Sequence, residues 1–174
     1  MRWTKTLCTT LALLLTACEI PDLVFDNELN LTNSNFPAII FNPSTVETSV
    51  GNSATLTIYV LEVKNLGGAH AQIEFDHMRL TITSVTAGTF FDSAQVSAPI
   101  FIHQNDGTGT LDINTFYMGP DNGVSGTGDI ATISFMARVI GQTPVNFTNK
   151  TEIVDADDNP ITIKSKSNGM VEAK

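Results

Sequence analysis

Residues 123–140 constrain the fold more than any other part of the sequence. Every odd-numbered residue of 131–139 is apolar and most of the even-numbered ones are polar, which is the spacing of a β-strand that buries one face. Val and Ile are frequent, no Pro interrupts the segment, and Gly141 follows it. We therefore predict a central strand that begins after a glycine-rich turn and buries Phe135 and Val139 in the core.

Short segments of the same kind follow one another along the rest of the chain. We predict further strands at residues 38–41, 54–64, 69–75, 80–85, 99–104, 110–118, 143–148, 151–154, 161–163 and 170–173. Turns rich in Gly, Asn and Pro separate them, including a hairpin at 105–109 and a break at 65–68. No stretch of eleven residues has helical spacing. In a chain of 174 residues, about nine short strands of this kind predict an all-β sandwich or jelly roll.

The first seventeen residues are predicted to be a signal peptide that is removed. Arg2 and Lys5 precede an apolar run that is too short to cross a bilayer. The run ends in Leu15-Thr16-Ala17-Cys18, which resembles the lipobox of bacterial lipoproteins. This resemblance implies that Cys18 carries the lipid and that the protein is anchored in the cell envelope, with Glu19 favouring the outer membrane or cell surface. The alternative is an ordinary signal peptide with an incidental Cys.

Removal of this segment makes the net charge of the chain more negative. It leaves seven basic and eighteen acidic residues, a formal charge of −11, which argues against nucleic acid and anionic lipid surfaces as partners. Membrane attachment is therefore expected through the N-terminal lipid only. Residues 18–37 are predicted to be the lipidated N-terminus and a flexible tether that spans about 25 Å, and 38–174 to be the folded domain. The alternative for 23–25 is that they join the edge of a sheet.

Several segments, taken in order, resemble the cohesin domain family and its looser bacterial relatives. They are residues 41–51, 63–69, 73–80, 84–88 and 126–135, with 154–161 similar to the loop before the last strands. The resemblance covers residues 39–174. It departs from the family at His77, where a Pro is usual, and at Asp158, where a Gly is usual.

The resemblance implies a nine-stranded jelly roll related to carbohydrate-binding modules. It also implies a non-catalytic role, in which the domain binds either a dockerin-type protein or a polysaccharide. Polysaccharide binding, linked to polysaccharide catabolism, would need a row of exposed aromatic rings, and this chain has few candidates: its only Trp, Trp3, lies in the predicted signal peptide. A structural lipoprotein of the envelope is a further alternative.

The resemblance also implies where a partner would dock. In cohesins this surface is the outer face of one sheet, whose strands correspond here to residues 69–75, 99–104, 110–117 and 130–139. The apolar parity of these strands gives the outward-facing residues. The predicted partner-binding set is His70, Gln72, Glu74, Asp112, Asn114, Phe116, Thr132, Ser134 and Met136. The alternative is an ordinary solvated sheet face.

Two glycine-rich motifs could suggest an enzyme, but neither has the required context. Residues 123–127 begin like the Gly-x-Ser-x-Gly elbow of hydrolases, and 126–131 match the letters of a dinucleotide fingerprint. Both chemistries need a helix after the motif, and here a turn and a strand are predicted instead. We therefore predict no enzyme activity and no cofactor.

Asp155, Asp157 and Asn159 have the first, third and fifth spacing of a calcium loop. Pro160 stands where such a loop needs Gly, and Lys166 stands where it needs Glu. These departures favour an acidic, solvated hairpin, and calcium binding is the open alternative. No other metal site is predicted, because the three His residues are scattered and have no paired ligands.

Overall fold

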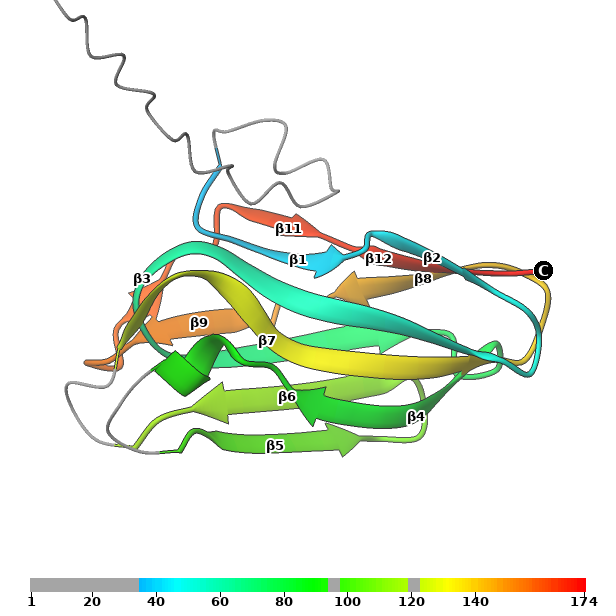
Figure 1. Cartoon of the computed structure of the whole chain (residues 1–174), viewed down its shortest axis with the longest axis horizontal. Coiled ribbons are helices and arrows are strands. Elements are labelled where there is room, and N and C mark those ends of the chain that lie inside the picture. Colours follow the sequence, from blue (N-terminus) through cyan, green and yellow to red (C-terminus); the bar gives the residue numbers. More distant parts are fainter. Residues whose placement is uncertain (1–34, 94–97, 119–122) are drawn as a thin grey trace, which may run out of the picture.

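The computed structural model describes residues 35–93, 98–118 and 123–174, which form a sandwich of two β-layers (Figure 1). The strands are β1 (Ala38–Asn42), β2 (Thr45–Thr48), β3 (Ser53–Phe75), β4 (Leu80–Ala87), β5 (Ile100–Asn105), β6 (Thr110–Phe116), β7 (Val124–Ala137), β8 (Gly141–Phe147), β9 (Glu152–Asp155), β10 (Pro160–Ile161), β11 (Ser165–Ser167) and β12 (Gly169–Ala173). A 3₁₀ helix, η1 (Phe90–Ser93), follows β4. The predicted signal peptide, Cys18 and most of the tether lie outside the described residues.

The all-β sandwich predicted from the sequence is confirmed. The described residues contain twelve strands instead of about nine, in part because the short strands β2 and β11 have too few residues to show an alternation.

Strand β3 belongs to both layers. Its first limb, residues 53–63, pairs with β1 and β7, and its second limb, residues 66–75, pairs with β6, β8 and β9. Between the limbs, Glu62 and Asn65 have φ of 49° and 54°, so the strand bends sharply at one end of the molecule (Figure 1). The predicted break at 65–68 is therefore wrong. The bend redirects the strand without ending its pairing.

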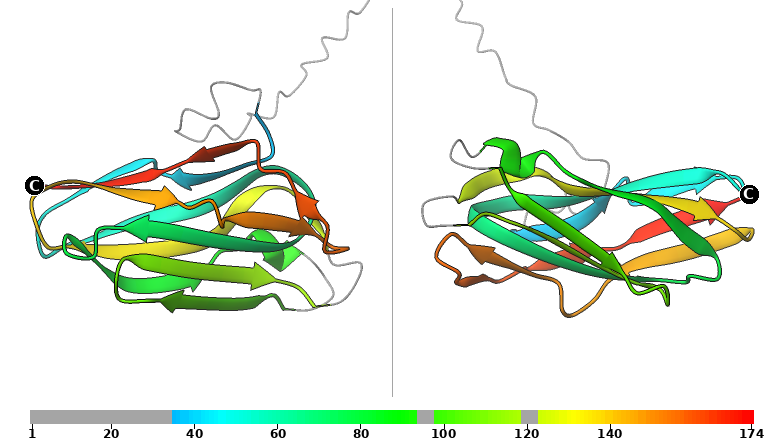
Figure 2. Two further views of the ribbon diagram at one scale, coloured as in Figure 1. Left: turned by 180° about the vertical axis from the view of Figure 1, so that it is seen from behind. Right: turned by 90° about the horizontal axis from the view of Figure 1, so that it is seen from below.

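The two limbs of β3 organise the two layers. One layer has the order β4, β7, first limb of β3, β1 and β11. The other contains β5, β6 and the second limb of β3, which pairs in turn with β9 and β8, followed by β12 and β2. The view from behind in Figure 2 shows β8, the second limb of β3, and β6 in this second layer.

The core lies between these layers. As predicted, β7 turns one side of the strand toward it. Phe135 is 0% exposed and meets Phe75 of the second layer edge-on, with ring centroids 5.5 Å apart. A second aromatic contact, the stack of Phe41 on Phe147 at 4.6 Å, fills the space near β12. Val139 is 45% exposed, so its predicted burial is wrong, because β7 ends at Ala137 before the parity reaches it.

The glycine-rich residues in front of β7 are not the predicted turn. Residues 124–128 form the start of β7, beside the bend of β3. Ser125 Oγ accepts a hydrogen bond from the Asn65 backbone N at 2.9 Å, and Thr127 Oγ1 accepts one from the Glu62 backbone N at 3.0 Å. These side chains satisfy the backbone donors that the bend turns away from the ladder. Ser125 therefore lies within a strand and has a structural partner, whereas the elbow motif has a helix after its Ser.

The hairpin predicted at 105–109 is confirmed, and it joins β5 to β6. Gly107 has φ of 76°, and Asp106 holds the turn by accepting hydrogen bonds from Thr108 Oγ1 at 2.6 Å and from the backbone N of Thr108 and Thr110 at 2.7 and 2.9 Å. The Thr108 hydroxyl and these N–H groups hold the pKa of the Asp106 carboxyl well below its usual range. This fixed turn sets the register of the β5–β6 pair.

Substitution of Phe135 tests the facing of the central strand. We expect Phe135→Ala to lower the free energy of unfolding by about 3–5 kcal/mol, because it leaves a cavity between the layers. Thr132→Ala, on the outer side of the same strand, is expected to cost less than about 1 kcal/mol. Urea unfolding of both variants measures the difference, and similar losses would contradict the packing described above.

Candidate functional site

The nine predicted partner-binding residues lie on two different faces of the sandwich. His70, Gln72 and Glu74 of β3 lie beside Asp112, Asn114 and Phe116 of β6 on the outer face of the second layer. Thr132, Ser134 and Met136 of β7 lie on the outer face of the first layer, because β7 pairs with the first limb of β3 and with β4. The prediction that all nine share one face is wrong for these last three.

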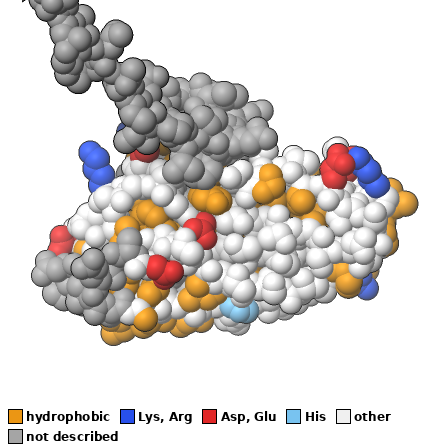
Figure 3. Space-filling model, in the orientation of Figure 1, with side chains coloured by type: hydrophobic (Ala, Val, Ile, Leu, Met, Phe, Trp, Pro, Cys, Tyr) orange, Lys and Arg blue, Asp and Glu red, His pale blue; other side chains and the backbone are white. Residues whose placement is uncertain are grey.

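The face that carries Thr132 and Ser134 is uniform in chemistry. Thr55 Oγ1 and Ser134 Oγ lie 3.2 Å apart, as do Thr57 Oγ1 and Thr132 Oγ1. Figure 3 views the molecule from this side, and most of the surface over β7 and β4 is white, the colour of uncharged polar side chains and backbone. The hydroxyl groups here are satisfied by one another, and the surface has the composition of a solvated sheet face.

The outer face of the second layer is ordered in rows that cross β5, β6, β3 and β9. The strand register gives three rows: Ile100, Phe116, Gly68 and Val154; Ile102, Asn114, His70 and Glu152; and Gln104, Asp112 and Gln72. Ile102 is 55% exposed. The first row is therefore apolar, the second combines Ile102 with polar side chains, and the third is entirely polar.

A hydrogen-bonded network centred on Asp112 links the third row to His70 of the second row and to Thr148. Asp112 Oδ1 accepts a hydrogen bond from Gln72 Nε2 at 2.9 Å and lies 2.8 Å from His70 Nε2, and Thr148 Oγ1 donates to Gln72 Oε1 at 2.9 Å. Burial by itself raises the pKa of the Asp112 carboxyl, but the hydrogen bonds from His70 and Gln72 and the charges of His70 and Lys150 outweigh it and lower the pKa. The network fixes these side chains before any partner arrives.

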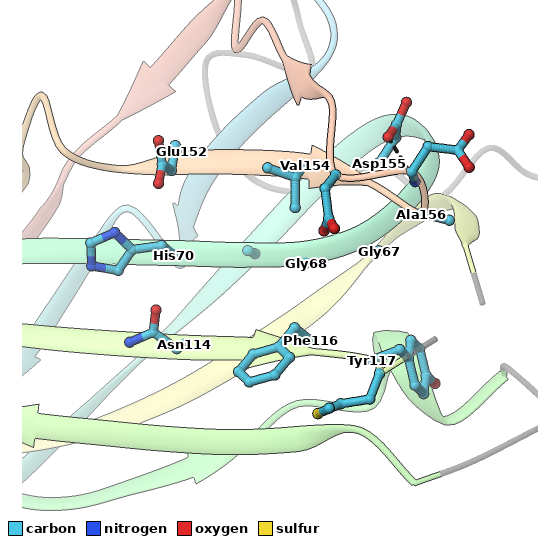
Figure 4. A pocket seen from close by; sticks show the side chains of 14 residues that line it. Gly67, Gly68, His70, Asn114, Phe116, Tyr117, Glu152, Val154, Asp155 and Ala156 are labelled. Atoms are coloured by element: carbon cyan, nitrogen blue, oxygen red, sulfur yellow. Dashed lines mark hydrogen bonds between the residues drawn. The ribbon is translucent and has the colours of Figure 1, made fainter. Parts of the chain in front are cut away.

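A groove of about 660 Å³ lies at the end of this face where β3 bends (Figure 4). Gly67 and Gly68 form its floor, between Phe116 of β6 and Val154 of β9. A Cβ on Gly68 would lie 3.1 Å from Phe116 Cβ and 3.2 Å from Val154 Cγ2, so the missing side chain is what leaves this space open. A Cβ on Gly67 would lie 2.7 Å from the Asp155 carbonyl oxygen, which explains the close approach of the neighbouring hairpin.

That hairpin joins β9 to β10 and gives the groove an acidic rim. The rim consists of Glu152, Asp155, Asp157 and Asp158. Asp155 Oδ1 accepts hydrogen bonds from the backbone N of Asp157 and of Asn159, each at 2.9 Å, and the Asn159 backbone bond is the main cause of the lowered pKa of Asp155. The Asp155 carboxylate therefore closes its own hairpin. Asp158 has φ of 61°, the conformation in which Gly is favoured and Asp is tolerated.

Among the described residues, no group of three or more His, Cys, Asp or Glu side chains is placed to hold a metal ion. The part of the chain that the structure describes also contains no helix long and apolar enough to cross a membrane.

Sequence reasoning did not identify several residues of this surface. Ile102, Glu152, Val154 and Met118 lie on the face or line the groove. Ile102 was within a predicted strand, but its facing depends on the β5–β6 register, which places it opposite Asn114. Val154 and Glu152 reach the face only because β9 pairs with the second limb of β3, and no local pattern encodes that pairing.

The family comparison covers nearly all of the described residues. Residues 40–173 match the model of the cohesin domain family. The chain belongs to the cohesin domain family. No curated protein sequence gives a significant match.

Several solved cohesins share the fold of this chain. A non-cellulosomal cohesin from the archaeon Archaeoglobus fulgidus is 18% identical, with a TM-score of 0.64 over 79% of this chain and 90% of that one. The sixth cohesin of scaffoldin B from Acetivibrio cellulolyticus, solved in complex with a mutant Cel5 dockerin, is 20% identical, with a TM-score of 0.66 over 79% and 98%. A type II cohesin from the cellulosome of the same organism is 18% identical, with a TM-score of 0.67 over 77% and 94%.

The network around Asp112 predicts a dependence of stability on pH. Because the pKa of Asp112 is lowered in the folded state, its contribution should be fully present above the ordinary value of 3.8 and lost as pH falls through the lower folded value. The difference in unfolding free energy between wild type and Asp112→Asn is expected to be about 1 kcal/mol at pH 7, allowing for solvent screening of a partly exposed group, and to vanish near pH 2.

Urea unfolding of both proteins between pH 7 and 2 measures this difference. Asn114→Ala, on the same strand and face, is the control, and its difference from wild type should not depend on pH. A difference for Asp112→Asn that is the same at pH 7 and pH 2 would contradict the charge-based role of the network.

Proposed function

We propose that this cohesin domain is a non-catalytic binding module that docks a dockerin-type protein on the outer face of β5, β6, the second limb of β3, and β9. The observation that carries the proposal is the mixed composition of this face. Exposed Ile102 and half-buried Phe116 lie beside a fixed polar network. Apolar anchors surrounded by hydrogen-bonding groups are typical of protein interfaces.

The comparisons support a protein partner. The scaffoldin B cohesin, which shares the fold, was solved in complex with a dockerin, so this architecture is compatible with such a partner. A polysaccharide-binding face would need several exposed aromatic rings, whereas Phe116 is the only Phe, Tyr or Trp among the described residues of the rows on this face. Over the described part of β7 and its neighbours, the opposite face pairs Thr with Ser and Thr, and it has no exposed apolar anchor of the kind that Ile102 provides.

The proposed docking face can be tested with purified dockerin modules of known sequence. The full chain, solubilised in detergent, would be titrated by calorimetry with a panel of such modules and, in separate experiments, with soluble polysaccharides. For any module that binds, the double substitution Ile102→Asp and Phe116→Ala should weaken binding roughly 30-fold or more, because it removes both apolar anchors. Met136→Ala, on the opposite face, is the matched control and should leave affinity within about twofold.

Three outcomes would count against the proposal. Binding to polysaccharide but to no dockerin module would favour the carbohydrate alternative. Equal binding by the double variant and wild type, with the fold confirmed by circular dichroism, would exclude this face. A greater loss in Met136→Ala than in the double variant would place the site on the other layer.

We also propose that the protein is held at the cell envelope by a lipid on Cys18. The support is the sequence Leu15-Thr16-Ala17-Cys18 together with a formal charge of −11 after cleavage, which disfavours direct adsorption to an anionic membrane. In the structure, Phe36 packs against a small buried cluster next to β1. The first strand, β1, therefore belongs to the layer that does not carry the proposed docking face. A tether that leads to β1 would leave that face accessible.

Substitution of Cys18 tests the anchor. We expect Cys18→Ala to move the protein from the membrane fraction to the soluble fraction, because no acyl chain can be attached. Fractionation after a high-salt wash, followed by immunoblotting, measures the shift. Retention of the variant in the washed membranes would show that something other than this lipid holds the protein there.

A further inference from the structure

The groove above Gly67 and Gly68 differs in chemistry from the rest of the face. Its walls contain apolar side chains, Phe116 and Met118 on one side and Val154 on the other, and its rim is acidic. The described residues that line it include no Lys or Arg. An apolar space with one-sided charge at its rim is a site that can select both the shape and the charge of what enters it.

The charge of the rim is available to a partner. Glu152, Asp157 and Asp158 are exposed, and their carboxylates form no hydrogen bond or ion pair with any other described residue. Asp155 differs, because its carboxylate accepts hydrogen bonds from Asp157 and Asn159 within the hairpin. Three negative charges around one opening, without a Lys or Arg among the described lining residues, favour a positively charged group.

The floor of the groove is open because residue 68 has no side chain. Phe116 and Val154 lie on either side of Gly68, in the same row of the sheet. Without a Cβ at this position, the volume of about 660 Å³ is larger than a single aliphatic side chain, so one can enter without displacing Phe116 or Val154.

Two possible occupants from the chain itself are disfavoured by charge. Residues 19–34 of the predicted tether contain Glu19, Asp22, Asp26 and Glu28 and no Lys or Arg, so the acidic rim would repel them. A second copy of the chain carries the same strongly negative net charge, −9 for the whole sequence. A separate protein with a basic docking surface fits the groove better than either.

We propose that the groove receives an aliphatic side chain of the partner and that Lys or Arg residues adjacent to it on the partner pair separately with the carboxylates of Glu152 and Asp157. This inference rests on the proposed function and specifies what a dockerin-type partner must present to this chain. An acidic residue at that position of the partner would be repelled by the rim. A neutral residue there would leave the rim carboxylates without a cation, so either kind of partner would bind more weakly. The flat rows around Ile102 supply general contact area, and the groove supplies discrimination.

The test uses a dockerin module that binds in the calorimetric panel. The double substitution Glu152→Gln and Asp157→Asn is expected to weaken its binding about five- to tenfold and to reduce the salt dependence of the association rate, because two exposed attractive pairs are removed. Glu62→Gln is the matched control. Glu62 is an exposed glutamate of the first limb of β3, in the layer that does not carry the docking face, and its substitution should change affinity less than about twofold.

A double-mutant cycle then identifies the partner's cation. Each Lys and Arg of the module would be replaced by Gln and measured against wild type and Glu152→Gln. One of them should show a coupling of about two- to fivefold with Glu152, and the others none. Gly68→Leu should also weaken binding at least tenfold by filling the groove. Because that variant crowds Phe116 and Val154, Val154→Ala serves as a second variant that alters the groove wall without crowding and should weaken binding about threefold or more.

The outcomes separate this inference from the proposed function. If no dockerin module binds, the proposed function fails and the inference fails with it. If Ile102→Asp with Phe116→Ala abolishes binding but the rim and groove variants behave like Glu62→Gln, the docking face stands and the groove assignment is overturned. If binding falls in the rim variant but no partner Lys or Arg couples to Glu152, the proposed ion pair is overturned.

Discussion

The bend of β3 is the constraint on which the rest of the structure depends. At Glu62 and Asn65 the backbone adopts left-handed conformations, and the freed N–H groups are taken up by Thr127 and Ser125 of β7. The Asn65 carbonyl in turn accepts from the backbone N of Ala156 at 2.9 Å. One bend thus ties together the two layers and the β9–β10 hairpin, and it places the glycine floor of the groove directly after it.

The two outer faces are suited to different tasks because of how their polar groups are satisfied. On the β7 face, hydroxyls of neighbouring strands pair with one another, which leaves a neutral, solvated surface. On the β6 face, the carboxylate of Asp112 collects donors from His70 and Gln72, while Ile102 lies exposed next to them. Side chains that are already fixed lose little further entropy on binding, which is the reason we assign the proposed docking to this face.

The role that we propose for the groove is to add charge selection to that face. Asp155 uses its carboxylate to close the hairpin, and this leaves Glu152, Asp157 and Asp158 around an apolar opening. Residue 68 has no side chain, and the lack of a side chain at Gly67 lets the hairpin come close to β3. Both features depend on glycine and on the path of the backbone. Selectivity in this proposal therefore comes from where the backbone comes close and where it leaves space.

The sequence by itself determined most of the strands, the facing of β7 around Phe135 and the 105–109 hairpin, because period-two alternation and turn residues act over a few neighbouring positions. It also pointed to the cohesin family. The tertiary structure alone decided which strands lie side by side. Alternation shows which residues share one face of a strand but carries no information on its layer, so Thr132, Ser134 and Met136 were predicted beside His70 although β7 lies in the other layer. For the same reason, the sequence did not place Ile102 and Val154 on this face. Gly67 and Gly68 were predicted to end a strand, whereas in the structure they form the floor of a groove.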